Sequence, residues 1–286
     1  MNAIHRMKHL IPRLLLSFRI PYLTDSVREC PICRGASEPE NCKRRSDLWR
    51  CTVCDHVYAA SVPRRLLLEH LYGGMQYWLM DKGHQGIQTI AFGSQWDGFL
   101  EARMAILVRA GLNCNGAGKK NIFEIGCSEG MLVANLQRCG HKVAGCDMNA
   151  AIVARGKQCL GVDIVAGAFE GLSLPVSTYD FVISFHTLEH MRAPETVFDK
   201  ITKILRVDGT VVIEVPGGKE EYGTLDHLHF FSRQSLERLI ATWFEKVEII
   251  ENSYTNSNGD QVCSYYGSGR YPRKLQGNGG RGLEND

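Results

Sequence analysis

The sequence predicts an α/β protein built around a doubly wound, mainly parallel β-sheet, with a small cysteine-containing module in front of it. Three observations lead to this prediction. Apolar, strand-like runs alternate with helix-like segments from residue 121 to 251, the first run ends in a glycine-rich turn, and two C-x-x-C pairs precede the alternation. Strands that alternate with helices are typical of parallel sheets, because each crossover helix covers one face.

Composition limits the class of protein. The chain has 286 residues, of which 44% are hydrophobic and 22% charged, the balance of a globular protein with one large domain and a small satellite. No apolar run reaches the roughly 18 residues that span a bilayer, so we expect no transmembrane segment. The 11 cysteines are odd in number and scattered, which argues against a secreted disulfide framework and favours a reducing, cytoplasmic location.

Residues 1–27 form a basic N-terminal segment. Pro12, Arg13 and Arg19 interrupt its apolar stretch and no small-residue cleavage site follows, so we favour an amphipathic surface segment over a targeting or membrane-surface role. The first 65 residues hold 12 Lys and Arg against 6 Asp and Glu. This surplus is compatible with anionic partners such as phosphates, nucleotide-linked substrates or RNA, although solubility explains it slightly better.

Residues 28–60 are expected to form a zinc ribbon. Two C-x-x-C knuckles, "CPIC" and "CTVC", are separated by 17 residues, and together they supply the tetrahedral four-sulfur cage that Zn²⁺ prefers. Such a closed cage is structural rather than catalytic. A redox dithiol is the weaker alternative, and Cys42 or His56 are alternative ligands. The predicted ligands are Cys30, Cys33, Cys51 and Cys54.

Residues 61–115 are expected to be a helical linker or lid. A helix is predicted over 94–110, where apolar residues recur at helical spacing after a serine cap. The aromatic residues Tyr72, Tyr77 and Trp78 could close over a ligand, but such a stripe is more often part of a core.

Residues 116–266 are expected to form the main α/β domain, followed by a disordered tail at 267–286. Apolar runs mark the strands, and glycines and polar caps delimit the helices. The segment 260–266 is predicted to be a final edge strand. The other predicted strands are 121–125, 142–147, 162–167, 179–185, 210–215 and 246–251, and the predicted helices are 129–139, 149–160, 193–206 and 232–244.

The turn after the first predicted strand carries the main functional signal. The stretch "NIFEIGCSEGML" places Glu124 near the end of a strand and glycines in the turn to a helix, and Asp147 ends the next strand. In a doubly wound sheet, ligands bind beyond the carboxyl ends of the strands, and glycines let the backbone approach them closely. Because a phosphate site would avoid a carboxylate, Glu124 indicates a ligand that carries a positive charge or needs an acceptor. Asp147 is placed to accept hydrogen bonds from ribose hydroxyls.

With these residues, the segment 121–251 resembles the class I S-adenosylmethionine-dependent methyltransferases. "EIGCSEG" is similar to the family's first motif, "YDFVISFHTLEHM" to its fourth-strand motif, and "ILRVDGTVVIEVP" to the turn before its fifth strand. "DHLHFFSRQSLERL" resembles a segment frequent in members that modify small molecules or sugars. The resemblance implies a seven-stranded Rossmann-like sheet in the order 3-2-1-4-5-7-6, with an antiparallel seventh strand, and S-adenosylmethionine as the cofactor.

The same resemblance implies a set of cofactor-binding residues. Glu124 would organise the loop near the amino group of the cofactor, and Asp147 would hold the ribose. Ser128 replaces the middle glycine of the motif. Ala168 stands where relatives often place an acid for the adenine amine, which leaves Phe169 to pack on the adenine and Glu170 to shift in as an alternative acid. The implied set is Glu124, Gly126, Cys127, Ser128, Gly130, Asp147, Met148, Ala168, Phe169 and Phe185.

Four of the ten histidines fall in segments expected to overhang the cofactor. Methyl transfer from a sulfonium mainly requires alignment, but an oxygen nucleophile often needs a base, and histidine can act as one near neutral pH. We expect His186 or His229 to be this base, whereas a hydrogen-bonded loop role is the alternative for each histidine. A metal site formed with Glu189 is a further alternative, although the spacing is not diagnostic. The candidate catalytic residues are His186, His229, His190 and His227.

The leading hypothesis is methyl transfer to a small-molecule or sugar acceptor, at oxygen in preference to carbon. The runner-up is an RNA base methyltransferase, because "CKRRSDLWRC" places basic residues on the ribbon. Against it, the Asn/Asp-Pro-Pro-aromatic motif of many base N-methyltransferases is absent, and "SFHT" stands at that place. A non-catalytic cofactor-binding module is a third hypothesis. A dinucleotide oxidoreductase is disfavoured because the G-x-G-x-x-G spacing is lacking.

Overall fold

The computed structural model of the protein describes residues 24–43, 45–72, 95–114, 118–224, 226–255 and 261–273. Most of the basic N-terminal segment, Tyr77, Trp78 and the chain beyond 273 therefore lie outside the described residues. Within the described part of the chain, no helix is long and apolar enough to cross a membrane.

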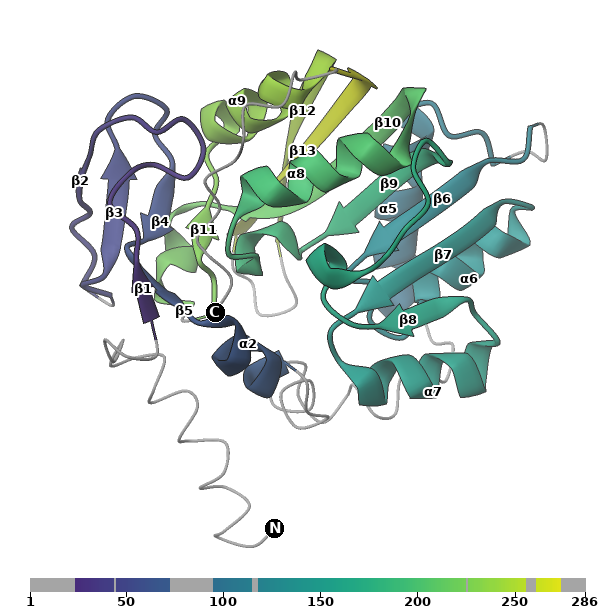
Figure 1. Cartoon of the computed structure of the whole chain (residues 1–286). Helices are drawn as coiled ribbons and strands as arrows, with labels where there is room; N and C mark the ends of the chain where they lie inside the picture. The colour runs from purple at the N-terminus through teal and green to yellow at the C-terminus, as the bar shows by residue number, and fades with distance from the viewer. Residues whose placement is uncertain are drawn as a thin grey trace, which may run out of the picture.

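A seven-stranded mixed sheet forms the centre of the larger part of the molecule (Figure 1). Read along the chain, its strand order is 3-2-1-4-5-7-6. The first five strands are mutually parallel, and the last strand in the chain is inserted antiparallel between the fifth and sixth. From one edge to the other, the strands are β8 (Ile164–Ala166), β7 (Lys142–Asp147), β6 (Asn121–Ile125), β9 (Tyr179–Phe185), β10 (Leu205–Gly217), β13 (Gln261–Pro272) and β12 (Phe244–Thr255).

Helices cover both faces of this sheet (Figure 1). The helices α5 (Gln95–Arg109), α6 (Met131–Arg138) and α7 (Ala150–Leu160) share one hydrophobic core with Ile122. The helices α8 (Pro194–Ile204) and α9 (Arg233–Trp243) share the other with Phe123 and Ile125. Because side chains alternate across a strand, Glu124 belongs to the same face as Ile122, the face that α5 covers.

Residues 24–63 fold into a second unit, which we call the cysteine module. It contains a two-stranded sheet, β1 (Thr24–Ser26) with β5 (Ser61–Pro63), and the strands β2 (Ser37–Pro39), β3 (Leu48–Cys51) and β4 (Val57–Ala59). The short helix α2 (Arg65–Tyr72) follows it. The fourth strand of its larger sheet comes from far along the chain, because β11 (His229–Phe230) pairs antiparallel with β4. In Figure 1, β11 lies between the module and the large sheet.

The strand β13 differs from the sequence expectation in two ways. It lies inside the sheet rather than at its edge, and it runs to Pro272, through the first part of the expected disordered tail. Two glycines of this strand are required by packing. A Cβ on Gly267 would lie 2.3 Å from Ile240 Cδ1, and one on Gly269 would lie 2.7 Å from Phe244 Cγ. The glycines therefore let α9 approach the sheet.

Candidate functional site

The turn after β6, which we call the glycine turn (residues 125–130), is held in a tight left-handed path. Gly126, Ser128 and Gly130 have φ angles of 73°, 50° and 81°, a region that favours glycine and that Ser128 enters as an uncommon exception. Both oxygens of Asp147 accept backbone hydrogen bonds of 2.9 Å, one from Ser128 N and one from Asn149 N. The carboxylate at the end of β7 thus fixes the shape of the turn.

Gly126 also fixes the distance between this turn and the segment after β9. A Cβ on Gly126 would lie only 2.0 Å from Thr187 Oγ1 and 2.6 Å from Thr187 Cγ2. The contact brings the 3-10 helix η2 (Leu188–His190) close to the glycine turn. Two of the sequence segments expected to meet beyond the strand ends are therefore in direct contact.

Glu124 lies beneath the turn, with only 2% of its surface exposed. Its Oε2 atom has no hydrogen-bond partner among the described residues. Burial, with a smaller contribution from Asp147, raises the pKa of Glu124 to about 7, although Arg103 opposes the shift. A buried carboxyl with an unused acceptor fits a site that receives a cationic donor.

The residues implied on the adenine side lie in two different environments. Met148 and Ala168 are half-buried at the surface of the site. The ring of Phe169 is 2% exposed and packs in the core, 6.0 Å from the ring of Phe123, so it offers little free face for stacking. Lys200 donates to the carbonyl oxygens of Phe169 and Glu170, at 2.5 and 3.1 Å, and fixes this turn.

Cys127 and Phe185 are buried in the core on the α5 side. The guanidinium of Arg103 lies 4.8 Å from the centre of the Phe185 ring. Cys127 is 5% exposed and Phe185 4%, so both side chains belong to the core.

His186 is held between two buried carboxylates. Its Nε2 lies 3.0 Å from Glu214 Oε1, and its Nδ1 lies 3.6 Å from Glu189 Oε1. Burial alone would lower the pKa of His186, but the contacts with Glu189 and Glu214 outweigh it and raise this pKa to about 9. An imidazole that is already protonated at neutral pH cannot accept a proton, so the geometry argues against our expectation that His186 is the base.

His229 is also poorly placed to act as a base. It is 2% exposed, and its Nδ1 lies 3.1 Å from His56 Nε2 in the cysteine module. Burial lowers the pKa of His229 to about 4. The side chain therefore joins β11 to the module instead of facing an acceptor.

The other two candidate histidines meet beside η2. His190 and His227 have ring centres 4.8 Å apart, and donor atoms of Glu189, His190 and His227 all lie within 4.8 Å of one another. We call these three residues the histidine cluster. The hydroxyl of Tyr72, one of the aromatic residues considered as a lid, lies 3.1 Å from His190 Nδ1.

The four cysteines of the two knuckles come together within the cysteine module. Their sulfur atoms lie within 4.8 Å of one another, with separations of 3.6 Å for Cys30–Cys54 and 3.4 Å for Cys33–Cys51. Four thiolates around Zn²⁺ at ~2.3 Å require separations of about 3.8 Å, so the donor set fits a tetrahedral cage. The alternative ligands Cys42 and His56 lie outside this group, and His56 instead faces His229.

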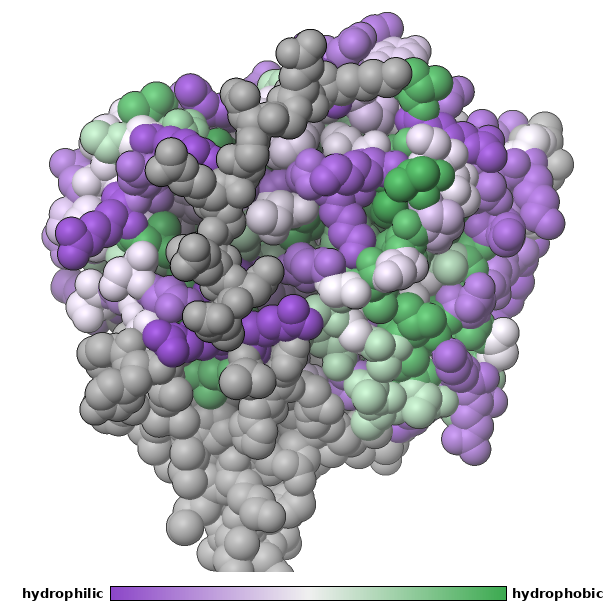
Figure 2. All heavy atoms as spheres, in the orientation of Figure 1, coloured by the Kyte–Doolittle hydropathy of each residue, from purple (hydrophilic) through white to green (hydrophobic). Residues whose placement is uncertain are grey.

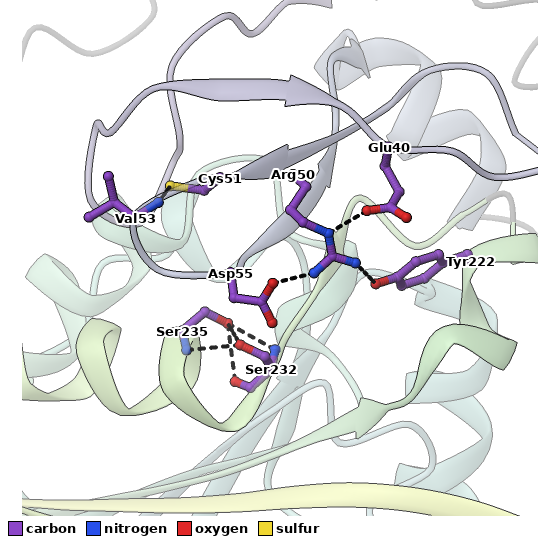
Figure 3. Close-up of polar contacts among 8 residues, drawn as sticks. All are labelled: Glu40, Arg50, Cys51, Val53, Asp55, Tyr222, Ser232 and Ser235. Atoms are coloured by element: carbon purple, nitrogen blue, oxygen red, sulfur yellow. Dashed lines mark hydrogen bonds and ion pairs between the residues drawn. The ribbon is translucent and has the colours of Figure 1, made fainter.

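Polar contacts fasten the module to the sheet domain. Arg45 donates to the carbonyl oxygens of Thr224 and His227, both at 2.8 Å. Arg50 donates to the hydroxyl of Tyr222 at 3.0 Å and pairs with Glu40 and Asp55 inside the module (Figure 3).

Sequence reasoning missed Arg103, Thr187 and Glu214, which complete the site. Glu214 carried a usable signal, since a single acid in the otherwise apolar stretch "TVVIEV" is unusual for a buried strand. Arg103 carried none, because it looked like an ordinary charged residue of a surface helix.

A family model and two curated relatives match part of this chain, and all three are methyltransferases by description. Residues 123–213 match the family model described as "Methyltransferase domain". A Mycolicibacterium smegmatis protein named "Probable S-adenosylmethionine-dependent methyltransferase" is 30% identical over 101 residues. The "Ubiquinone biosynthesis O-methyltransferase, mitochondrial" of Schizosaccharomyces pombe is 29% identical over 105 residues. Each alignment covers 34% of this chain and only 38% of the relative.

Solved structures share the fold. A phosphoethanolamine N-methyltransferase 2 of Haemonchus contortus, in complex with phosphomonomethylethanolamine and S-adenosylhomocysteine, superposes with a TM-score of 0.50 at 16% identity, over 60% of this chain and 53% of that chain. A protein of Pyrococcus horikoshii OT3 superposes with a TM-score of 0.51 at 16% identity, over 64% of this chain and 93% of that chain. The sheet domain therefore has the fold of these structures, and its residues 123–213 match a methyltransferase-domain family over part of the chain.

Proposed function

We propose that the chain is an S-adenosylmethionine-dependent methyltransferase that acts on a small-molecule or sugar acceptor, at oxygen. The observation that carries the proposal is the contact between Gly126 and Thr187, because it brings the glycine turn and the histidine cluster to the same end of the sheet. The partial likeness to a ubiquinone biosynthesis O-methyltransferase supports oxygen as the accepting atom.

The residues of the glycine turn would bind and orient the cofactor. Bound S-adenosylmethionine supplies the activated methyl group. Glu124 would accept from its amino group with the free Oε2 atom, and Asp147 would face the ribose from the end of β7. Gly126 and Gly130 leave room for the methionine portion, with Ser128 between them, while Met148 and Ala168 line the adenine side.

The histidine cluster would form the acceptor end of the site. His190 is 23% exposed at its side chain and His227 lies against it, so an acceptor can reach this corner from solvent. Glu189 is buried beneath both. We propose that these residues bind the acceptor hydroxyl, whereas His186 and His229 position the loops that carry them.

We propose that Zn²⁺ occupies the four-cysteine cage and has a structural role. The cage offers only sulfur ligands and has no open position. Its function would be to hold β4, and through β4 the strand β11 that follows His227.

Contacts of two of the module's arginines favour a small acceptor over RNA. Arg45 has a side chain only 2% exposed, paired with Asp47, and Arg50 pairs with Glu40 and Asp55. The charges of Arg45 and Arg50 therefore stabilise the module and are not free to bind the phosphates of RNA. In Figure 2, hydrophilic side chains are interspersed with apolar ones where the described residues of the module are visible.

Calorimetric titration of the full-length, zinc-loaded protein with S-adenosylmethionine and S-adenosylhomocysteine tests the cofactor site. We expect binding that weakens about 10- to 100-fold in Asp147→Ala, because a charged acceptor of hydrogen bonds is lost. Asp208→Ala is the matched control, since Asp208 is exposed near the other end of β10, and it should bind as the wild type does. A folded wild-type protein that binds neither compound would contradict the proposal.

A further inference from the structure

The two ring nitrogens of His190 face different groups. Nδ1 lies 3.1 Å from both the carbonyl oxygen of Asp226 and the hydroxyl of Tyr72. When Nδ1 donates to the carbonyl, which can only accept, the lone pair of the imidazole is on Nε2. That Nε2 lies 3.8 Å from Glu189 Oε1, an oxygen that can also only accept. In this tautomer, a cation between Nε2 and Oε1 would stabilise both atoms.

The side chain of Glu189 has a second oxygen that could bind a cation. Glu189 is 1% exposed, and its Oε1 faces His186 Nδ1 at 3.6 Å. Its second oxygen, Oε2, has no hydrogen-bond partner among the described residues. A buried carboxylate oxygen without a donor is expensive unless something that the described contacts do not include binds it.

The donor set is that of a known kind of metal site. Two imidazoles and one carboxylate are the ligands of many catalytic Zn²⁺ and Fe²⁺ centres, which keep at least one position open. The donor atoms of Glu189, His190 and His227 all lie within 4.8 Å of one another, so small side-chain movements suffice to close around an ion. The contact from His190 Nδ1 to the Asp226 carbonyl also matches the outer hydrogen bond that usually orients a ligating histidine.

We propose that Glu189, His190 and His227 bind a divalent transition-metal cation, distinct from the zinc of the cysteine cage, whose open position receives an oxygen of the acceptor. This inference rests on the proposed function and adds to it how the acceptor is held. A bound divalent cation would lower the pKa of a coordinated hydroxyl. Its proton could then pass to solvent water, and the site would need no separate histidine base.

Metal stoichiometry of the untagged full-length protein tests the inference. Elemental analysis after zinc loading and dialysis should give two zinc ions per chain for the wild type and one for Glu189→Gln and His227→Gln. His141→Gln is the matched control, because His141 is buried at the turn before β7 and belongs to neither cluster; it should retain two. With Co²⁺ as the probe, the second equivalent should add absorption without thiolate charge-transfer bands.

The outcomes separate this inference from the proposed function. One ion per chain in a wild type that is folded and binds S-adenosylhomocysteine overturns the second metal site and leaves the methyltransferase proposal intact. Two ions in all variants overturns the ligand assignment. Absent cofactor binding with two ions retained counts against the proposed function alone. Because Glu189→Gln also removes one of the two carboxylates that contact His186, His227→Gln decides the case if the first variant does not fold.

Discussion

The glycine turn and the histidine cluster lie side by side but are built in different ways. The turn is formed by residues 125–130 and by Asp147 at the end of the neighbouring strand, and backbone hydrogen bonds define it. The histidine cluster combines η2 with the segment before β11, and its surroundings include Tyr72 from α2 and the cysteine module. The first structure is local in sequence, whereas the second depends on contacts between distant segments.

This difference predicts how the two halves of the site should respond to mutation. The cofactor half is the glycine turn with Asp147, and the acceptor half is the histidine cluster. The cofactor half belongs to the sheet and should survive damage to the cysteine module. The acceptor half is held in place by β4, Arg45 and His56. We therefore expect the module to control the acceptor side without controlling cofactor binding.

Loss of the four-cysteine metal cage should have the largest effect and is the strongest test of this difference between the two halves. Cys51→Ser should abolish zinc binding, and because structural zinc supplies on the order of 10 kcal/mol of folding energy in small modules, the module should unfold. Hydrogen exchange should then show loss of protection at Ala59, whose amide donates to Leu228 O. The amide of Gly126, which donates to Cys146 O, should stay protected and is the internal control.

Affinity for S-adenosylhomocysteine in the same variant should change by less than about threefold, since the variant leaves the glycine turn in place. If the amide of Gly126 also loses protection, or if cofactor binding disappears, the two halves are one cooperative unit and the comparison fails.

Substitution of Gly126 tests the contact that joins the two halves. In Gly126→Ala the new Cβ would collide with Thr187 in a backbone conformation that disfavours side chains. We expect the free energy of unfolding to fall by about 2–4 kcal/mol and cofactor affinity to fall at least about tenfold. Both are measurable by urea denaturation and calorimetry.

Gly140→Ala is the matched control for this variant. Gly140 has a φ of +88°, but nothing lies within 4 Å of the place that its Cβ would take, so only the backbone strain of about 1 kcal/mol remains. Equal effects at the two positions would show that strain, and not the contact with Thr187, determines the loss.

The same contrast decides what the sequence could predict. Local patterns encode the strands of the large sheet, the glycine turn, Glu124 and Asp147, so these could be predicted from the sequence. The sequence could not predict the grouping of His190 with His227, the pairing of His56 with His229 or the addition of β11 to the module. The reason is that β4 and β11 are about 170 residues apart and no local pattern specifies their pairing. The role of His186 depended on Glu214, a neighbour supplied by β10.

A smaller effect should separate the buried from the exposed contacts between module and sheet domain. Arg45→Met removes a side chain that is 2% exposed and donates to Thr224 O and His227 O. Because this leaves Asp47 and two carbonyl groups short of a donor, we expect a loss of about 3 kcal/mol in the free energy of unfolding. Zinc content should be unchanged.

Arg34→Met is the matched control for Arg45→Met. Arg34 and Glu195 form an ion pair at 3.4 Å with side chains 68% and 45% exposed, and such pairs contribute less than about 1 kcal/mol. A loss at Arg34 as large as that at Arg45 would mean that surface charge, and not the buried guanidinium, fastens the module.

The smallest predicted effect is a gain in the free energy of unfolding, whereas the other variants lose stability. It concerns the cofactor half alone. Burial raises the pKa of Glu124 to about 7, above its ordinary value, so the folded protein holds a proton there that the unfolded chain releases at lower pH. Stability is therefore lost as pH rises from about 4.5 to 7, and the loss persists above that window. Glu124→Gln should escape it, so its advantage over the wild type should be about 2–3 kcal/mol larger at pH 8 than at pH 5. Urea denaturation at the two pH values measures this difference in stability, and calorimetry should show cofactor affinity reduced at least about tenfold in the variant.

A pH-independent difference in stability would mean that Arg103 already neutralises Glu124 in the folded protein. The free carboxylate oxygen would then not be available to bind a cationic ligand. A gain in stability together with a loss of binding would instead show that the cofactor half maintains a destabilising buried acid for its ligand.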